Sequence, residues 1–333
     1  MKNFKFGVIG TGMISGMFRE AVREVPGAGI TTVLSRNAST GDDFVRSFFD
    51  DGDERPAVVT TLDELFRSDI DAVYVASPNR YHAETSIEAM EAGFDVLCEK
   101  PIASNLREYD RMTLTSEKTG RLLLEAMRPA FDPGYVAVRN NLSKIGPIRH
   151  VSLEYCQYSS RYDRFKAGEL PRAFDPTYSN AAVMDIGVYP IYVSSMLFGM
   201  PEDRIRSSSV ILKNGMEGGG EVVLPYSGMN VAISYSKICD SVNPSIIIGE
   251  EGSISIDKLS SPSRIVLKTK GSEERVIYSS DRTNNMRFEI GSFIELSLSR
   301  KILHEYGTFS AITVTLIDEI RRQNGIVFPT DDE

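Results

Sequence analysis

The stretch GVIGTGMISG at residues 7–16 decides the fold of this chain. A short apolar strand runs directly into Gly10 and Gly12, and a helical pattern that opens with Met13 and Ile14 follows at once. Glycines at these places let a backbone approach a pyrophosphate, which lies on the N-terminus of the following helix. Glycine pairs after strands also occur in flavin proteins, methyltransferases and ordinary turns, so the motif needs support from the surrounding pattern.

That support comes from the alternation of elements along the first 125 residues. Short β-rich runs alternate there with helical patterns, which predicts a doubly wound parallel sheet of about six strands. The expected strands are residues 6–9, 30–34, 58–60, 72–76, 94–98 and 122–124. From residue 131 onward, longer alternating strands and glycine turns favour a large, mainly antiparallel open sheet with helices on one face. We therefore predict an α/β chain with a Rossmann domain at residues 1–125 and an α+β domain at residues 126–333.

Composition restricts the partners of the chain. Its 37 basic and 46 acidic residues give a net charge of -9, which opposes nucleic-acid binding. The longest charge-free stretches, residues 186–201 and 222–236, are shorter than the ~20 residues that a membrane span needs. The N-terminus enters a strand without room for a signal peptide, so we expect a cytoplasmic protein that does not bind membranes. The three cysteines and three histidines are scattered, and their spacing predicts no metal site.

The end of the second predicted strand indicates which nucleotide is preferred. An NAD enzyme usually places an acid there, about twenty residues after the glycines, to bind the ribose hydroxyls. This chain has Ser35 and Arg36 and no acid at that place. A serine hydroxyl and a forked guanidinium are suited to a 2′-phosphate, which favours NADP, with NAD as the alternative. Arg36 could instead be a solvated loop residue.

Lys100 lies in the sequence Glu99-Lys100-Pro101, directly after the apolar run at residues 95–98. This is the carboxyl end of a predicted parallel strand, where cofactor and substrate are expected to meet. The other interpretation is a surface lysine beside a turn proline.

Several motifs together resemble the Gfo/Idh/MocA oxidoreductases, the family named for glucose-fructose oxidoreductase and inositol dehydrogenase. The combination of Glu-Lys-Pro with Asp-x-Gly-x-Tyr at this separation is specific for the family, and the matching stretches span nearly the whole chain. They are the glycine motif, residues 76–82 (ASPNRYH), 92–101 (AGFDVLCEKP), 185–190 (DIGVYP) and 317–323 (IDEIRRQ).

The resemblance implies a role for each matching residue in the reaction. Lys100 would donate or accept the proton at the substrate hydroxyl whose carbon exchanges hydride with nicotinamide. Asp185 and Tyr189, four residues apart in a helical pattern, would share one face. Tyr189 would assist proton transfer or hold the substrate oxygen, and Asp185 would accept a substrate hydroxyl or orient Lys100. Alternatively, Asp185 is an N-terminal helix acid and Tyr189 a core aromatic residue.

The resemblance also extends the set of expected cofactor contacts. Residues 77–82 match the loop under the ribose and nicotinamide, although Asn79 could instead cap a helix. Arg128 matches the stretch that enters the substrate domain, or it forms an interdomain salt bridge. The expected cofactor-binding residues are Gly10, Gly12, Met13, Ile14, Ser35, Arg36, Ser77, Pro78, Asn79, His82, Glu99, Lys100 and Arg128.

The sequence thus predicts an NADP-preferring oxidoreductase acting on a small hydroxyl or carbonyl compound such as a sugar, a polyol or a dihydrodiol. Two alternatives stay open: an NAD-dependent glycosidase of the same superfamily, and a catalytically silent cofactor-sensing protein. The retained Lys100, Asp185 and Tyr189 argue against the sensor, which needs no proton-transfer group. The open sheet, and the habit of the family, predict a homodimer or homotetramer.

Overall fold

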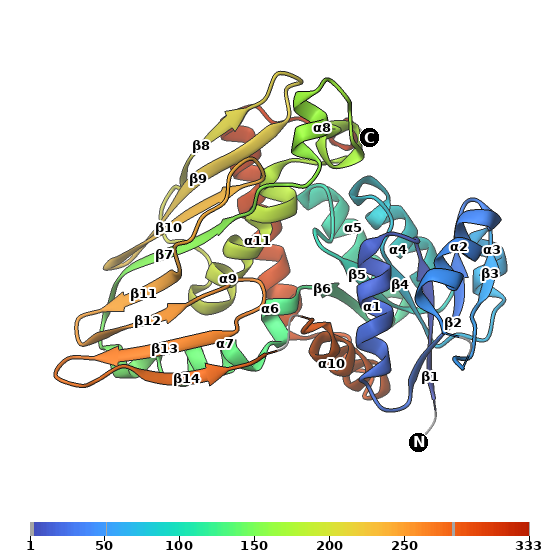
Figure 1. The fold of residues 1–333 in the computed structure, drawn as a ribbon, viewed down its shortest axis with the longest axis horizontal. Coiled ribbons are helices and arrows are strands. Elements are labelled where there is room, and N and C mark those ends of the chain that lie inside the picture. Colours follow the sequence, from blue (N-terminus) through green and yellow to red (C-terminus); the bar gives the residue numbers. More distant parts are fainter. Residues whose placement is uncertain (1–2, 51, 282–283, 333) are drawn as a thin grey trace. The chain divides into compact units, whose positions relative to one another are not determined.

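The computed structural model describes residues 3–50, 52–281 and 284–332, which form two compact units. The first unit contains residues 1–103, 107–126 and 284–307, and the second contains residues 104–106, 127–283 and 308–333. Each unit has its own sheet (Figure 1). The chain passes into the second unit at residue 127 and later returns to the first unit at residues 284–307.

The first unit is built on a six-stranded sheet in the order β3-β2-β1-β4-β5-β6, and every neighbouring pair is parallel. Its strands are β1 (Phe4–Ile9), β2 (Ala28–Leu34), β3 (Ala57–Val59), β4 (Ala72–Val75), β5 (Asp95–Glu99) and β6 (Leu123–Ala126). Its helices include α1 (Met13–Arg23), α2 (Ala38–Phe48), α3 (Leu62–Phe66), α4 (His82–Glu91) and α5 (Leu106–Thr119). The order of the strands reverses between β1 and β4, which is the place where a doubly wound sheet binds its ligand. The predicted Rossmann fold is confirmed.

Helix α10 (Met286–Leu298) also belongs to the first unit, although it comes from the far end of the chain. The ring of Phe293 lies 6.2 Å from that of Phe4 and 5.8 Å from that of Phe6, so the helix packs on β1. The sequence prediction placed this segment in the domain of residues 126–333. An amphipathic pattern shows that one face of a helix is buried, but it does not identify the surface that covers that face.

The second unit contains an eight-stranded sheet in the order β14-β13-β12-β11-β7-β10-β9-β8. All its neighbouring pairs are antiparallel except β7 and β10, which are parallel. The strands are β7 (Ile148–Cys156), β8 (Arg206–Ile211), β9 (Glu217–Tyr226), β10 (Met229–Ser236), β11 (Ser245–Gly249), β12 (Gly252–Ile256), β13 (Arg264–Thr269) and β14 (Arg275–Ser279). The expectation of a large, mainly antiparallel sheet is thus confirmed.

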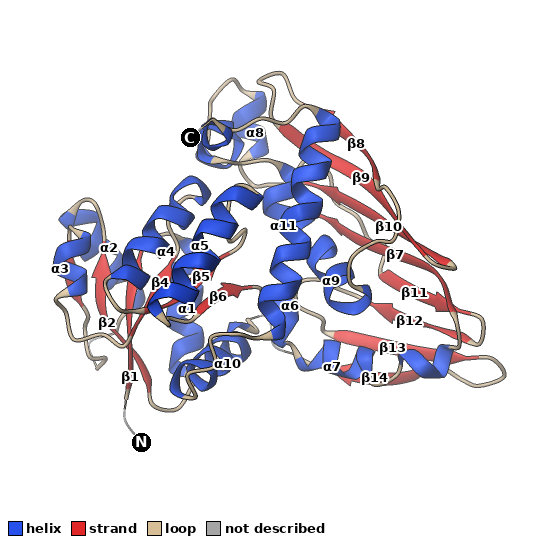
Figure 2. Ribbon diagram, turned by 180° about the vertical axis from the view of Figure 1, so that it is seen from behind, coloured by secondary structure: helices blue, strands red, loops and turns tan. Residues whose placement is uncertain are grey.

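Helices cover one face of this sheet (Figure 2). They are α6 (Arg128–Phe131), α7 (Pro133–Arg139), α9 (Val188–Phe198) and α11 (Glu305–Asn324), and α8 (Tyr162–Lys166) lies in the loop after β7. A π-helix at Val183–Gly187 leads directly into α9, which packs on β7 and β10. Shorter 3₁₀ segments are Asn79–Tyr81, Leu142–Ile145, Arg172–Phe174, Pro176–Tyr178 and Pro329–Asp331.

One helical stretch among the described residues, Pro176–Phe198, is long and apolar enough to cross a membrane, which the charge-free runs alone did not indicate. Its most apolar window is 83% buried within the structure. Its side chains pack against the inner face of the eight-stranded sheet, as the core helix of a globular unit does.

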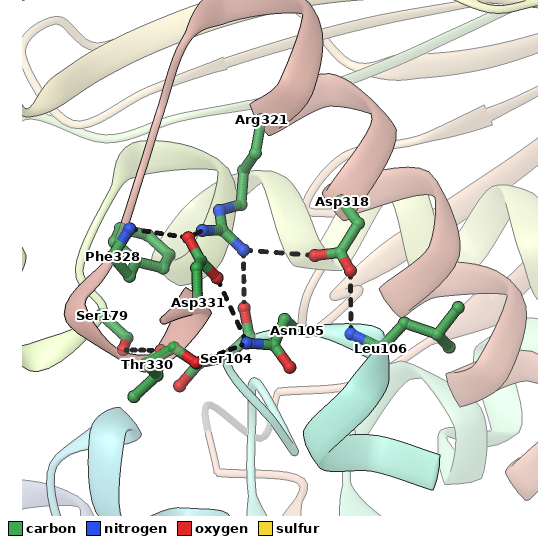
Figure 3. A network of polar contacts seen from close by, with 9 residues as sticks. All are labelled: Ser104, Asn105, Leu106, Ser179, Asp318, Arg321, Phe328, Thr330 and Asp331. Carbon is green, nitrogen blue, oxygen red and sulfur yellow. Dashed lines mark hydrogen bonds and ion pairs between the residues drawn. The ribbon is translucent and has the colours of Figure 1, made fainter. Parts of the chain in front are cut away.

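A polar network joins the segment at residues 104–106 to α11 and the chain that follows it, more than 200 residues later in the sequence (Figure 3). Arg321 of α11 donates to the Ser104 carbonyl at 2.9 Å and forms ion pairs with Asp318 and Asp331. The side-chain amide of Asn105 donates to the Asp331 carboxylate and to the carbonyl of residue 330, both at 3.2 Å. The last described residues are therefore held on α11 together with the segment that follows the Glu-Lys-Pro motif.

Candidate active site

The glycine turn after β1 has the geometry of a pyrophosphate site. Gly10 has a φ of +110°, and a Cβ there would lie 2.4 Å from the carbonyl oxygen of Ala76, so only glycine fits. Gly12 caps the 11-residue helix α1 without a side chain, and a Cβ built on it would meet only open space. The first turn of α1 contains no acidic residue, and Met13 at its start is 69% exposed. An anion can therefore approach this helix end closely.

The segment after β2 lies beside this turn, because β1 and β2 are paired. Ser35 is buried and its backbone N–H donates to the Val59 carbonyl at 3.0 Å, whereas Arg36 is exposed. Asn37 accepts from the Ser39 N–H at 2.9 Å and caps α2. The exposed guanidinium thus stands between a strand end and a helix N-terminus, with no carboxylate in the segment to repel a phosphate.

His82 links two loops at the same edge of the sheet. Its ring lies 2.8 Å from the Ser77 carbonyl through Nε2 and 2.8 Å from the Pro101 carbonyl through Nδ1. The residue is only 1% exposed, and burial lowers the pKa of its imidazole. The ring is thus enclosed between these two carbonyls, and the contact of His82 with the cofactor stays a prediction. Its role is to hold together the loops that follow β4 and β5.

Ser77 contributes a buried polar atom to the same edge of the sheet. Its Oγ is buried and has no hydrogen-bond partner within the described part of the chain. A buried hydroxyl of this kind costs free energy unless a ligand or water satisfies it. Together with the open space at Gly12, it indicates that the edge of the sheet is shaped for a bound polar group.

Buried side chains hold the backbone of the Glu-Lys-Pro motif in place. The Glu99 carboxylate accepts from the Tyr74 hydroxyl at 2.5 Å and from the Lys100 backbone N–H at 3.2 Å. Burial, and the neighbouring Glu99 charge, raise the pKa of Tyr74 well above its usual value. Glu99 is 7% exposed, so it acts on the backbone of Lys100 rather than on solvent. The peptide bond between Lys100 and Pro101 is cis. Lys100 itself is partly exposed at the carboxyl end of β5.

The second unit contains the other predicted catalytic residues. The Asp185 side chain is 39% exposed, and one carboxylate oxygen lies 2.9 Å from Nζ of Lys237. The Tyr189 hydroxyl lies 3.5 Å from the guanidinium of Arg128, whose Cζ stands 5.8 Å from the centre of the Tyr189 ring. Arg128 thus contacts Tyr189 within the second unit. The sequence suggested a cofactor contact or an interdomain salt bridge for Arg128, and neither expectation included Tyr189.

The helical stretch that bears these two residues is not α-helical throughout. The expectation of a shared face assumed α-helical turns, but Asp185 lies in a π-helix that ends where α9 begins. Tyr189 is 6% exposed, and its ring packs edge-on against Tyr155 at 5.4 Å. Its ring therefore packs in the core of the second unit while its hydroxyl lies beside the Arg128 guanidinium, and its role in the reaction stays a prediction.

Sequence reasoning missed the groups that support these residues. Lys237 follows an ordinary alternating strand, and Glu217 lies among glycines. Neither forms part of a motif. A single charged residue at the end of an apolar strand is a weak signal, because most such residues are solvated. Among the described residues, no group of three His, Cys, Asp or Glu side chains could hold a metal ion.

Comparison with known proteins agrees with this geometry. Residues 4–127 match the model of the oxidoreductase family with an NAD-binding Rossmann fold, and residues 141–255 match the GFO/IDH/MocA C-terminal domain. The chain is 37% identical to the scyllo-inositol 2-dehydrogenase (NADP(+)) of Bacillus subtilis, covering 98% of this chain and 99% of that protein. It is 26% identical to the trans-1,2-dihydrobenzene-1,2-diol dehydrogenase of Danio rerio, with 99% of each chain covered.

Among solved structures, a 3-ketoreductase from Actinomadura kijaniata in complex with NADP and TDP-benzene has the same fold. Its TM-score is 0.83 at 22% identity, and 98% of this chain and 99% of that one are covered. The family models and the relative at 37% identity carry the assignment. The chain therefore belongs to the Gfo/Idh/MocA family and is an NAD(P)-dependent oxidoreductase.

Proposed function

We propose that this enzyme is an NADP-preferring dehydrogenase or reductase that interconverts a CH–OH group and a carbonyl on a small polyol or sugar. The observation that carries the proposal is the carboxyl edge of the six-stranded sheet. The glycine turn after β1, the Ser35-Arg36 pair after β2 and Lys100 after β5 all lie on it. The relative from Bacillus subtilis, an NADP(+)-dependent scyllo-inositol dehydrogenase, supports both the cofactor and the substrate class.

Different residues of the first unit would bind different parts of the cofactor. The Gly10 and Gly12 turn and the N-terminus of α1 would hold the pyrophosphate, and Ser35 and Arg36 would hold the 2′-phosphate. The Ser77 hydroxyl would donate to a polar atom of the bound nucleotide. When bound, the nicotinamide supplies or accepts the hydride, which is the only step that no side chain can perform.

Lys100 would carry the proton of the reaction. Its ammonium would donate to the substrate oxygen when a carbonyl is reduced, and its amine would accept the proton when an alcohol is oxidised. Glu99 and His82 hold the backbone on either side of it, so the position of the Nζ atom depends on buried contacts. The Asp185 carboxylate would accept a second hydroxyl of the substrate, and the Tyr189 hydroxyl would hold the reacting oxygen.

The test is a screen for net turnover of free cofactor. The purified protein is incubated with NADP⁺ or NAD⁺ and a panel of inositols, aldoses and dihydrodiols, and the absorbance of the reduced nicotinamide is followed. We expect reduction of NADP⁺ with at least one cyclic polyol. Hydrolysis of a glycoside without net cofactor reduction would instead indicate the NAD-dependent glycosidase. Tight cofactor binding without any turnover across the panel would indicate a sensor, and either result would refute the proposal.

We also propose that the protein is a homodimer or homotetramer formed through the sheet face that the helices leave open. Exposed apolar side chains on four of its strands support this association, because they alternate with core-facing residues. They are Val210, Val223, Ile248 and Val276. Light scattering at micromolar concentration tests it, and a monomer would contradict it. The cytoplasmic location stays a prediction.

A further inference from the structure

Lys237 is a lysine in an environment that lysines rarely occupy. It lies one residue beyond β10, where its backbone N–H donates to the Gly218 carbonyl at 2.9 Å. Its side chain is 2% exposed, although burying an ammonium costs several kcal/mol unless partners compensate. Nζ donates to the Ala173 carbonyl at 2.8 Å and stands 5.1 Å from the centre of the Phe174 ring. Phe174 belongs to a small apolar cluster with Phe165 and Met216, so the ammonium lies beside apolar side chains.

The ion-pair partner of this buried cation is Asp185, with 2.9 Å between Nζ and Oδ2. The two ends of the pair differ in exposure, because the lysine is enclosed while the Asp185 side chain is 39% exposed. An ion pair with one exposed partner stabilises the fold only slightly, whereas burying the lysine charge costs free energy. The ion pair does fix the orientation of the Asp185 carboxylate. Lys237 holds one carboxylate oxygen, and the side chain is still partly exposed to solvent.

A second buried group holds the backbone of the same helix. Glu217 is fully buried, and burial raises the pKa of its carboxyl. It accepts from the backbone N–H of Val183, the first residue of the π-helix, at 2.7 Å. The hydroxyls of Tyr235 and Ser209 donate to its other oxygen at 2.7 and 2.6 Å. Glu217 therefore fixes the backbone that bears Asp185, while Lys237 fixes the side chain.

We propose that Lys237 is a positioning residue that holds the Asp185 carboxylate in the orientation that accepts a substrate hydroxyl. This inference rests on the proposed function and deepens it, because it assigns recognition of a second hydroxyl to the Asp185–Lys237 pair. The pair suits a vicinal diol or polyol, in which one oxygen reacts and another is held. Lys237 acts only through Asp185 and touches neither the cofactor nor the reacting atoms.

The test substitutes Lys237→Met, which keeps the length of the stem and suits the aromatic surroundings. We expect KM for the polyol to rise about tenfold, with kcat within about threefold and NADP affinity unchanged, because a binding contact common to ground and transition state is weakened. Lys213→Met is the matched control. Lys213 is exposed and stands 5.3 Å from the Phe165 ring of the same cluster, so its loss should leave KM unchanged.

A double-mutant cycle separates positioning from general damage. In an Asp185→Asn background, Lys237→Met should change KM less than about twofold, because no carboxylate remains to be oriented. If the Met variant does not accumulate as folded protein, Lys237→Gln is measured in its place. Its amide can still donate to the carboxylate, so we expect a smaller rise in KM, which should again disappear on the Asp185→Asn background. An unchanged KM in the single variant of an active enzyme, or an undiminished effect on the Asp185→Asn background, would overturn the inference alone. Absence of polyol turnover in the unsubstituted enzyme would instead overturn the proposed function.

Discussion

Replacing Arg321 by Met should destabilise the second unit strongly. The residue is 4% exposed, and its guanidinium lies among the Ser104 carbonyl, the Asp318 carboxylate at 3.2 Å and the Asp331 carboxylate, as Figure 3 shows. It also stacks on the Phe328 ring at 4.0 Å. The substitution removes every charged donor from this network but retains an unbranched apolar stem.

The magnitude follows from the groups that the substitution leaves behind. Breaking a buried ion pair by removing one partner costs about 3 to 5 kcal/mol, because the other charge remains buried. The side chains of Asp318 and Asp331 are 31% and 26% exposed, so water can partly rehydrate them. The methionine stem also keeps part of the packing on Phe328. We therefore expect a loss of roughly 2 to 4 kcal/mol in the free energy of unfolding.

The neighbouring arginine on the same helix is the control. The Arg322 side chain is 61% exposed and donates to the two oxygens of Glu319 at 2.6 Å each. The side-chain hydrogen bond from Arg322 lowers the pKa of Glu319 to about 2. An exposed pair contributes at most about 1 kcal/mol, because water competes for both partners. Arg322→Met should therefore change stability far less, although it removes a bidentate ion pair.

Urea unfolding followed by circular dichroism measures the difference, since the chain has no tryptophan to report by fluorescence. Hydrogen exchange gives the local measurement. The backbone N–H groups of Leu106 and Phe328 donate to Asp318 and Asp331 at 2.8 Å each, and both should lose protection in Arg321→Met. A loss no greater than that of Arg322→Met, or unchanged protection at both amides, would refute the reasoning.

Three further predictions concern chemistry and the cofactor. Lys100→Met should lower kcat by about 10²- to 10⁴-fold with NADP affinity nearly unchanged, and near-normal steady-state turnover would contradict its role. Arg36→Ala should weaken NADP binding by about 1 to 3 kcal/mol and NAD binding much less, and calorimetry that finds equal affinities in the unsubstituted protein would argue against the assignment. Tyr189→Phe should lower kcat, and its effect should be less than additive with that of Lys100→Met, because both act on one proton-transfer unit.

The sequence was sufficient to predict the six-stranded sheet, because each of its strands is marked by a local pattern of apolar and turn residues. Gly10 and Gly12 follow a strand and precede a helical pattern, and that arrangement is visible in the sequence alone. The six predicted strands all correspond to strands of the structure, because each is an apolar run between turn residues. The assignment of α10 failed for the opposite reason. Phe293 packs on β1 from almost the full length of the chain away, and no local pattern records that distance.

The candidate site likewise contains residues that the sequence could identify and residues that it could not. Motif residues such as Lys100 and Asp185 could be found from the sequence, because their spacing is characteristic of a family. Their supports could not be found, because a buried polar group is recognised only when its partners are known. His82 shows the difference well: its motif was recognised, but only the two carbonyls at 2.8 Å reveal that it holds loops together.

In both units, the side chain that we propose to act on the substrate is held by buried neighbours. In the first, Lys100 is partly exposed, while Glu99 and His82, which hold its backbone, are buried. In the second, Asp185 is partly exposed, while Lys237 is buried beneath it. Water limits the strength of any contact made by an exposed group, whereas a buried contact is strong and costly to break. Precise placement therefore depends on the buried partner, and substitutions there should change kinetic constants although they remove no atom that meets the substrate.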